Sequence, residues 1–337
     1  MKKKRILFAI LNWGLGHATR SWELIHKYIN EGHQITLASD GVAKDFLKLE
    51  FPYLKLEELP SYNAVYGERG SLFEMIKNGF KTQLAVKDEK VWLEEYLKKN
   101  ECDLIISDNR YGIYDDSIKS IIITHQLNIK SPLASKLVNK QNHSWLNNFN
   151  EIWVPDSCSE LSGELSSPIP SNIKTKVKEI GWLSRFKGLN TSDFGETILA
   201  VVSGPEPQKS ILAQKLEQIL LDLDLKSTLY TGDPKKQEQQ LKGKLTIKSH
   251  SLSNEFAQDL LNAKVVIGRS GYSSLMDYKI AGKKMVLIPT PGQDEQNYLG
   301  DYLKSDFRVR LIPQEKLTSL SLQIALNSLI AHKDEMT

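Results

Sequence analysis

Short apolar runs alternate with longer amphipathic stretches along the whole chain. The runs in the first half are residues 5–11, 34–38, 104–107, 121–124 and 152–155, and the helical patterns between them include residues 18–31 and 72–99. A second series comprises residues 197–202, 227–230, 245–248, 265–267 and 285–288, followed by a final helical pattern over residues 314–331. Apolar strands separated by helices are typical of parallel sheets. The pattern therefore predicts an α/β protein with two Rossmann-like domains that face each other across a cleft.

The stretch between the two series has no sustained period. It covers residues 182–190 and contains the helix-breaking Gly188. We therefore expect a hinge there, with a first domain over residues 1–187 and a second over residues 188–337. Ligands of such sheets bind beyond the carboxyl ends of the strands, so the residues just after each apolar run are the functional candidates.

Composition and charge narrow the class of protein. The chain has 337 residues, of which 40% are hydrophobic and 25% charged, as in folded globular proteins. Its formal charge of +3 gives no reason to expect nucleic acid as a partner. Cys102 and Cys158 lack the spacing of a metal site or disulfide scaffold. The basic start leads into a predicted strand rather than a signal peptide, and no apolar run is long enough to span a membrane. We expect a cytoplasmic protein.

The first candidate site is the loop after the first strand, where residues 12–20 read N-W-G-L-G-H-A-T-R. Gly14 and Gly16 let the backbone approach a ligand closely, and the following helix start offers N–H donors. The same glycines resemble a dinucleotide fingerprint with Asp40 as the ribose-binding acid, but Thr19 takes the place of the third glycine. We favour a binding loop of another kind.

His17 and Asp108 are the candidate catalytic residues. His17 stands at the predicted helix start, where an imidazole can accept a proton from a ligand hydroxyl; a loop histidine bonded to the backbone is the alternative. Asp108 follows the run 104–107, so it also lies at the carboxyl end of a strand. A carboxylate there can orient the imidazole and stabilise its cation. The alternative is that Asp108 is an aspartate of a turn or a helix cap without a catalytic role.

The second candidate site follows the run 265–267, where a turn with glycine and serine leads into a helix. We expect a diphosphate to bind the amide groups of this helix start, the hydroxyls of Ser273 and Ser274, and the nearby Arg269. The lysine of a Walker loop is absent, which argues against γ-phosphate chemistry. One turn later, Asp277 can accept hydrogen bonds from a ribose diol; a surface aspartate is the alternative.

A third group of polar residues follows the run 285–288. Pro289 and Pro291 predict a stiff turn, after which Glu295, Gln296 and Asn297 open a helix. Carboxylate and amide groups suit the hydroxyls of a sugar, and an ordinary acidic helix start is the alternative.

These motifs together resemble the GT-B glycosyltransferases. The resemblance rests on G-L-G-H-A-T-R at 14–20, R-S-G-Y-S-S-L-M-D at 269–277 and P-T-P-G-Q-D-E-Q-N at 289–297, and it is closest to the family-28 type, which contains the peptidoglycan UDP-N-acetylglucosamine transferase. It covers both predicted domains and is more specific in the second. It implies the GT-B fold, an acceptor on the first domain, a UDP-linked sugar donor on the second, no metal or other cofactor, and a product in a cell-envelope glycan.

The resemblance also implies roles for individual residues. Asp277 stands where family 28 has a ribose-binding glutamate, and Gln296 and Asn297 stand on its sugar-binding glutamines. His17 and Asp108 are similar to the base and supporting aspartate of plant-type UDP-glycosyltransferases. The implied donor-binding residues are Ser203, Gly204, Leu252, Ser253, Arg269, Ser270, Gly271, Tyr272, Ser273, Ser274, Asp277, Glu295, Gln296 and Asn297. The expected acceptor-binding residues are Asn12, Trp13, Gly14, Gly16 and His125.

One loop departs from the family pattern, because Ser203-Gly204 continues with Pro205 in place of a further glycine. Asp222-x-Asp224 resembles a metal-binding motif, but it ends a predicted helix, and we discount it. The implied reaction is an inverting, metal-independent transfer with His17 as general base. A non-hydrolysing UDP-sugar 2-epimerase and a non-catalytic nucleotide-sugar-binding subunit are the rival functions.

The acceptor stays open between a glycan, a lipid-linked molecule and a small molecule. Residues 62–79 and 124–148 are its candidate walls. The second of these segments carries Lys130, Lys136, Lys140, Trp145 and Leu146, a combination that suits the inner face of an anionic membrane. A solvated amphipathic helix is the favoured interpretation of the same pattern.

Overall fold

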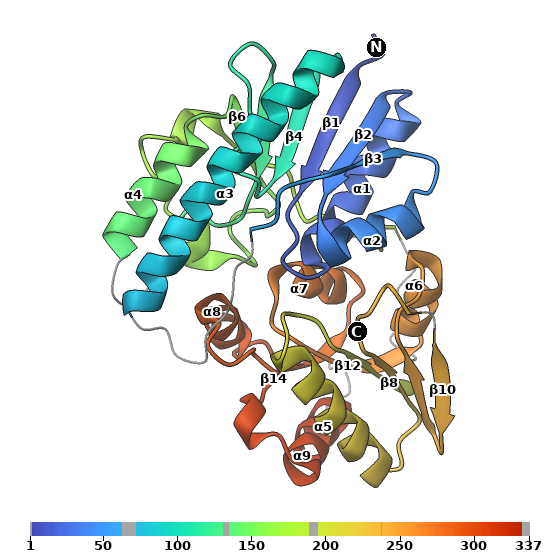
Figure 1. The fold of residues 1–337 in the computed structure, drawn as a ribbon. Helices are drawn as coiled ribbons and strands as arrows, with labels where there is room; N and C mark the ends of the chain where they lie inside the picture. Colours follow the sequence, from blue (N-terminus) through green and yellow to red (C-terminus); the bar gives the residue numbers. More distant parts are fainter. Residues whose placement is uncertain (1, 63–71, 131–134, 189–194, 237, 332–337) are drawn as a thin grey trace. The chain divides into compact units, whose positions relative to one another are not determined.

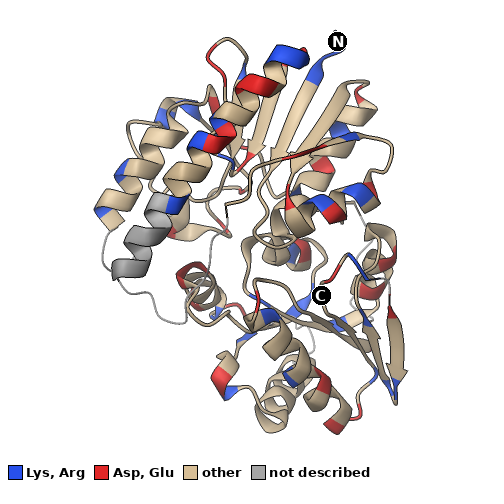
Figure 2. Ribbon diagram, in the orientation of Figure 1, with Lys and Arg blue, Asp and Glu red and all other residues tan. Residues whose placement is uncertain are grey.

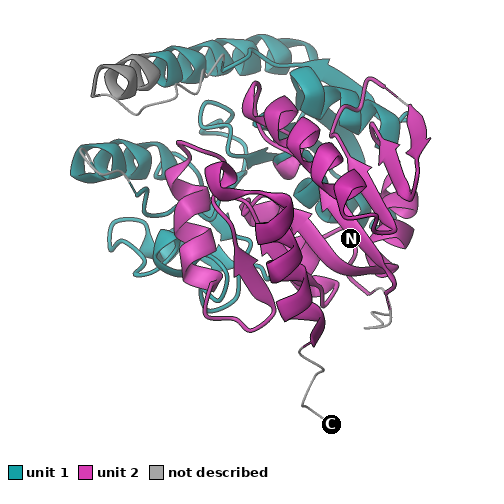
Figure 3. Cartoon of the chain, turned by 90° about the horizontal axis from the view of Figure 1, so that it is seen from below, with its two compact units in different colours: residues 1–13, 17–183 teal, residues 14–16, 184–337 magenta. Residues whose placement is uncertain are grey.

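The protein is described by a computed structural model that covers residues 2–62, 72–130, 135–188, 195–236 and 238–331. The chain forms two compact units (Figure 3). The first contains residues 1–13 and 17–183, and the second contains residues 14–16 and 184–337. The main part of the second unit starts at Ser184, within the segment 182–190 in which the sequence predicts a hinge.

Helices and strands alternate in both units (Figure 1). The first unit contains β1 (Arg5–Ile10), α1 (Gly16–Asn30), β2 (Gln34–Ser39), α2 (Gly41–Glu50), β3 (Lys55–Glu58), α3 (Leu72–Lys99), β4 (Leu104–Asp108), β5 (Ser120–Ile123), α4 (Ser135–Leu146), β6 (Glu151–Val154) and β7 (Val177–Glu179). The second contains β8 (Thr197–Val201), α5 (Gln208–Asp222), β9 (Ser227–Tyr230), β10 (Gln239–Lys242), β11 (Leu245–Lys248), α6 (Ser253–Leu261), β12 (Ala263–Gly268), α7 (Tyr272–Ile280), β13 (Lys284–Leu287), α8 (Asp294–Leu303), β14 (Val309–Leu311) and α9 (Ser319–Ala331).

The sheet of the first unit is parallel throughout, with the strand order β3-β2-β1-β4-β5-β6-β7. The order reverses between β1 and β4, which is the position where open α/β sheets bind ligands. Ile10 at the end of β1 is in register with Asp108 at the end of β4. The loops that follow these two strands therefore start side by side.

Burial explains why these central strands read as apolar runs. β1, β4 and β5 are covered on both faces, and β4 and β5 are buried at every position. One core cluster joins β1, β2 and β4 to Leu93 and Tyr96 of α3, and another joins β5 and β6 to Leu146 of α4. Acidic and basic side chains are interspersed along the described part of α3, as Figure 2 shows.

A buried ion cluster ties α3 to the ends of the central strands. Arg110, which follows β4, pairs with Asp40 after β2 and with Glu89 of α3, where its Nη1 is 3.2 Å from Glu89 Oε1. Glu89 Oε2 also accepts hydrogen bonds from Tyr62 Oη at 3.0 Å and from the amide of Gly112 at 2.8 Å. Burial raises the pKa of Glu89 to about 7, although Arg110 acts in the opposite direction. We infer that the cluster holds a proton on Glu89 at mildly acidic pH.

The sheet of the second unit has the order β10-β11-β9-β8-β12-β13-β14, and β10 is its antiparallel edge. Its order reverses between β8 and β12, where Val201 is in register with Gly268. Helices α5 and α9 pack against each other, and their apolar side chains form one core cluster with β8, β12 and β13. The loops after β8 and β12 lie at the switch point of this sheet.

The final helical pattern is corrected by the structure. The sequence predicts one helix over residues 314–331, but residues Gln314–Lys316 form a short 3₁₀ turn and α9 begins at Ser319. Between them Leu317 is extended and fully buried. Burial of this leucine in the core of the unit turns the backbone out of the helix.

Candidate active site

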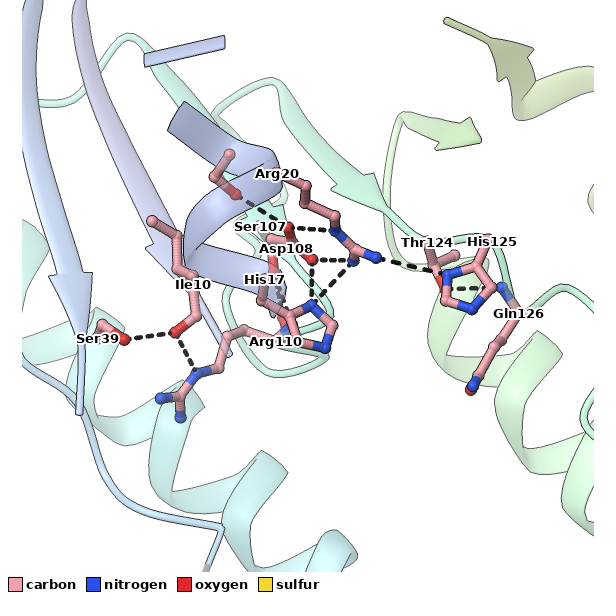
Figure 4. Close-up of polar contacts among 11 residues, drawn as sticks. Ile10, His17, Arg20, Ser39, Ser107, Asp108, Arg110, Thr124, His125 and Gln126 are labelled. Atoms are coloured by element: carbon pink, nitrogen blue, oxygen red, sulfur yellow. Dashed lines mark hydrogen bonds and ion pairs between the residues drawn. The ribbon is translucent and has the colours of Figure 1, made fainter. Parts of the chain in front are cut away.

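The first candidate site lies where β1 and β4 end. Asp108 is the last residue of β4, and His17 lies in the first turn of α1, which follows the loop after β1. The structure brings the two side chains together, with His17 Nδ1 at 2.7 Å from Asp108 Oδ1 (Figure 4). The Asp108 side chain is fully buried, whereas the His17 side chain keeps 12% of its surface exposed. An accessible imidazole is therefore backed by a buried carboxylate.

Two neighbours on α1 complete the surroundings of Asp108. Arg20 and Ser21 are three and four residues beyond His17, so they lie on the same face of the helix. Arg20 Nε donates to Asp108 Oδ2 at 2.8 Å, and Ser21 Oγ donates to the same oxygen at 2.9 Å. Sequence reasoning missed both residues, although their helical spacing from His17 was a usable signal.

Electrostatics fix the protonation of the pair. Burial and the charge of Arg20 lower the pKa of His17, against the opposing influence of Asp108. Burial alone would raise the pKa of Asp108, but the charges and hydrogen bonds of Arg20 and His17 hold it well below its usual range. An ionised carboxylate only accepts hydrogen bonds, so His17 Nδ1 carries the hydrogen. Nε2 of His17 is then the nitrogen that can take up a proton.

Three of the predicted acceptor residues belong to the loop after β1. The Asn12 side chain donates to Asp40 at 3.1 Å and accepts from the amide of Ala43 at 3.2 Å, so it fastens the loop to the start of α2. Trp13 is 44% exposed. Gly14 has φ +70°, a conformation that favours glycine.

The other two predicted acceptor residues, His125 and Gly16, lie outside the loop after β1. His125 follows β5 and is buried, with Nδ1 at 3.5 Å from Arg20 Nη1, as Figure 4 shows. Gly16 is the first residue of α1. Of the predicted acceptor walls, residues 63–71 and 131–134 lie outside the described residues.

The second candidate site, in the other unit, is the start of α7. Gly271 caps the helix in an extended conformation, and the amide of Leu275 donates the helical hydrogen bond to its carbonyl at 3.0 Å. The amide groups before Leu275 and the positive end of the helix dipole thus face the preceding turn. Ser273 is buried and Ser274 half-buried. Ser270 is fully buried and donates to the backbone carbonyl of Gln296 at 2.7 Å, which fixes the turn against α8.

Close packing explains the glycine that ends β12. A Cβ added to Gly268 would lie 2.7 Å from the hydroxyl of Tyr278, on α7 itself. Tyr278 is buried, and Tyr272 at the first turn is 3% exposed. The glycine therefore lets α7 start directly above the end of the strand.

Arg269, which the sequence predicts near the diphosphate, is held by three backbone carbonyls. Its guanidinium donates to the backbone carbonyls of Ile288 at 3.1 Å, Pro289 at 3.2 Å and Gln208 at 2.9 Å. The residue is 1% exposed, and burial lowers its pKa to about 10. In this structure Arg269 joins the turn after β13 to the first residue of α5.

Asp277 lies on the buried side of α7. Its Oδ1 accepts a hydrogen bond from Ser184 Oγ at 2.5 Å. Burial raises the pKa of Asp277 to about 6, while the charge of Arg185 and the hydrogen bond from Ser184 act in the opposite direction. Arg185 in turn lies over the ring of Phe256 at 4.8 Å and donates to Ser253 Oγ at 3.1 Å. The predicted ribose and base-reading residues, Asp277 and Ser253, therefore share one polar cluster.

The predicted sugar-binding residues open α8, as expected from the sequence. Gln296 is buried, and its Oε1 accepts from the amide of Thr290 at 2.8 Å while its Nε2 donates to Gln293. Its amide therefore supports the turn before the helix. Glu295 is half-buried and Asn297 is exposed.

The remaining predicted donor residues are in loops of the same unit. Ser203 and Gly204 follow β8 and are half-buried, and Gly204 has φ +107°. Leu252 precedes α6 and is 50% exposed. Beside Gly204 lies Thr290, whose Oγ1 is buried without a hydrogen-bond partner in the described residues.

Comparison with known proteins identifies the class of protein. Residues 201–337 match the model of the glycosyltransferase family 28 C-terminal domain. The chain is also similar to the UDP-N-acetylglucosamine–N-acetylmuramyl-(pentapeptide) pyrophosphoryl-undecaprenol N-acetylglucosamine transferase of Clostridium botulinum. The two are 22% identical over 338 aligned positions, and the alignment covers 94% of this chain and 88% of that protein.

Solved structures agree on the fold. The chain is similar to the glycosyltransferase of kitacinnamycin, with a TM-score of 0.66 and 16% identity over 98% of this chain and 91% of the other. It is also similar to the calicheamicin glycosyltransferase CalG4, with a TM-score of 0.65 and 14% identity over 99% of this chain and 91% of the other. The fold is that of the GT-B glycosyltransferases, as the sequence predicts.

The chain is a glycosyltransferase with the GT-B fold that is similar to family 28, and its residues 201–337 match the family 28 C-terminal domain. The predictions of family, fold class and enzyme class are confirmed. Across the described residues, no helix combines the length and apolar character needed to cross a membrane.

Proposed function

We propose that the protein transfers a sugar, with inversion, from a UDP-linked donor to an acceptor hydroxyl, with His17 as general base. The observation that carries this proposal is the 2.7 Å contact between His17 Nδ1 and the buried, ionised Asp108. It leaves Nε2 to take the proton of the acceptor hydroxyl as the oxygen attacks the anomeric carbon. The bond from that carbon to the diphosphate oxygen breaks on the opposite face, and Asp108 stabilises the imidazolium.

The second unit supplies the donor side of the proposal. The leaving diphosphate gains negative charge, and the start of α7 offers amide groups, a helix dipole and the hydroxyls of Ser273 and Ser274 to stabilise it. The family 28 match covers these residues and supports a nucleotide-sugar donor. The name of the Clostridium relative supports UDP-N-acetylglucosamine as the donor and a lipid-linked acceptor. We therefore place the proposed reaction at the inner face of the membrane.

The donor can be identified by a thermal-shift screen of UDP-, GDP- and dTDP-sugars. A ligand at 100 times its Kd stabilises a folded protein by about 2.7 kcal/mol, which is readily detected. We expect UDP-sugars to raise the melting temperature most. Stabilisation by none of the three classes would contradict the proposal.

Product analysis separates the proposed transferase from its two rivals. An epimerase would convert the donor when incubated alone, and a non-catalytic subunit would bind the donor without turnover across a panel of acceptors. The transferase should consume donor in the presence of acceptor and release the nucleoside diphosphate.

Asp277→Ala should weaken the binding of UDP by roughly 1–3 kcal/mol, because a ribose hydroxyl would lose a buried acceptor. Calorimetry with UDP measures the change in affinity. It is done at about pH 8, above the pKa of about 6 for Asp277, so that this carboxyl is ionised in the wild type. Ser184→Ala is the matched control, since it removes the partner of Asp277 and keeps the carboxylate. Equal losses in both variants would show that Asp277 acts through the segment at Ser184 and not on the ribose.

A further inference from the structure

Arg20 occupies an unusual position for a cation, because it touches both members of the proposed catalytic pair. Its Nε donates to Asp108 Oδ2 at 2.8 Å, and its Nη2 pairs with Asp108 Oδ1. The same Nη2 lies 2.9 Å from His17 Nδ1. The residue is 2% exposed, so water screens these contacts little. Figure 4 shows the guanidinium beside the carboxylate, with contacts to the imidazoles of His17 and His125.

The charges of this cluster balance only while His17 is neutral. The groups that face His17 are Arg20 on α1, Asp108 on β4 and His125 after β5. Ionised Asp108 and Arg20 cancel each other through the bidentate pair. A proton taken up by His17 Nε2 would leave a net positive charge in a buried site, beside a second cation at 2.9 Å. In a simple aspartate–histidine pair the carboxylate would instead favour the imidazolium.

We propose that Arg20 is a positioning residue that keeps the imidazole of His17 neutral and correctly oriented, so that the base remains available in mildly acidic solution. The bidentate contact of Arg20 fixes the Asp108 carboxylate. The positive charge of Arg20 also opposes the stabilisation of a protonated His17 by that carboxylate. The electrostatic part of the proposal concerns His17 itself, and its benefit for turnover rests on the proposed function.

The chemistry of the side chain explains why an arginine suits this position. The planar guanidinium donates to both carboxylate oxygens at once, and it stays charged throughout the accessible pH range. Because His17 Nδ1 carries a hydrogen, the 2.9 Å contact with Nη2 acts through charge and not as a hydrogen bond. A lysine would keep the charge but would act as a single point donor. Arg20→Lys should therefore preserve part of the effect, whereas Arg20→Gln should remove the charge entirely.

The direct test is an NMR titration of the His17 imidazole in the full chain, assigned by comparison with His17→Gln. In the wild type we expect the pKa of His17 to lie below 6.5. In Arg20→Gln it should rise by about one unit or more, since an adjacent charge typically moves a pKa by about 1–3 units. Arg20→Lys should give a value between the two. Circular dichroism of each variant checks that it folds.

Ser21→Ala is the matched control, because it removes a neutral hydrogen bond from the same Asp108 oxygen. It should move the pKa of His17 clearly less than Arg20→Gln does. A wild-type His17 that titrates at or above 6.5 would overturn the proposal without any variant. Equal shifts in Ser21→Ala and Arg20→Gln would also overturn it, because they would reflect local rearrangement and not charge.

The pH profile of kcat/KM separates this proposal from the proposed function. If both hold, the acidic limb of the profile should move upward in Arg20→Gln by the shift that NMR measures. An NMR shift together with normal turnover in His17→Ala would leave the electrostatic role of Arg20 standing and remove the base. If His17→Ala is inactive and Arg20→Gln gives no NMR shift, His17 stands as the base and the electrostatic role of Arg20 is excluded.

Discussion

His17→Ala is expected to lower kcat by about 10²–10⁴-fold while the affinity for the donor nucleotide stays nearly unchanged. The variant removes Nε2, the atom proposed to take the acceptor proton, whereas the proposed donor-binding residues belong to the second unit. Steady-state kinetics with the donor found by thermal shift, and calorimetry with UDP, measure the two quantities separately.

A histidine elsewhere in the first unit provides the control for this variant. His33 lies in the turn after α1, where its Nδ1 accepts from the amide of Lys4 at 3.2 Å. His33→Ala should leave kcat within about twofold of the wild type, because His33 follows the end of α1 opposite to His17 and its contacts are with Lys4, Glu31 and Tyr28, away from the proposed base. Near-normal turnover in His17→Ala would exclude this residue as the base, and an equal loss in both variants would indicate a general defect of the unit.

The second large effect concerns stability and arises from the buried ion cluster of the first unit. The pKa of Glu89 is raised from 4.5 to about 7 by burial. Between these two values the folded state keeps a proton that the unfolded state has lost, so the contribution of Glu89 to stability falls as the pH rises. Glu89→Gln cannot titrate. Relative to wild type, its free energy of unfolding should therefore rise by up to about 3 kcal/mol from about pH 4 to pH 8.

Urea unfolding at a series of pH values tests this expectation. Glu94→Gln is the matched control, because Glu94 is an exposed glutamate on the same helix. Its difference from wild type should stay flat over the same range. A flat difference for Glu89→Gln, or one that falls with rising pH, would contradict the assignment of a buried proton to Glu89.

The central strands could be predicted from the sequence, whereas the edge strands could not. β4 and β5 are buried at every position and therefore read as continuous apolar runs. β3, by contrast, has the sequence KLEE and lies at the sheet edge without a fully buried residue. β10 at the edge of the other sheet is likewise largely exposed. Such strands are specified by their neighbours and leave no hydrophobic signal of their own.

The contact between His17 and Asp108 was predictable for a related reason. His17 and Asp108 follow apolar runs, and parallel strands bring their carboxyl ends to one edge of the sheet. The partnership of Arg20 with Asp108 spans 88 positions and depends on burial, which the sequence alone does not display. For Arg269, the sequence indicated a cation near the diphosphate, and the fold uses that cation to bind three backbone carbonyls.

A crystal structure of the chain with UDP would test the central proposal most directly. We expect the diphosphate oxygens within hydrogen-bonding distance of the amide groups at the start of α7 and of the hydroxyls of Ser273 or Ser274. Nucleotide bound elsewhere, with that helix start closed by its own side chains, would contradict the proposed donor site.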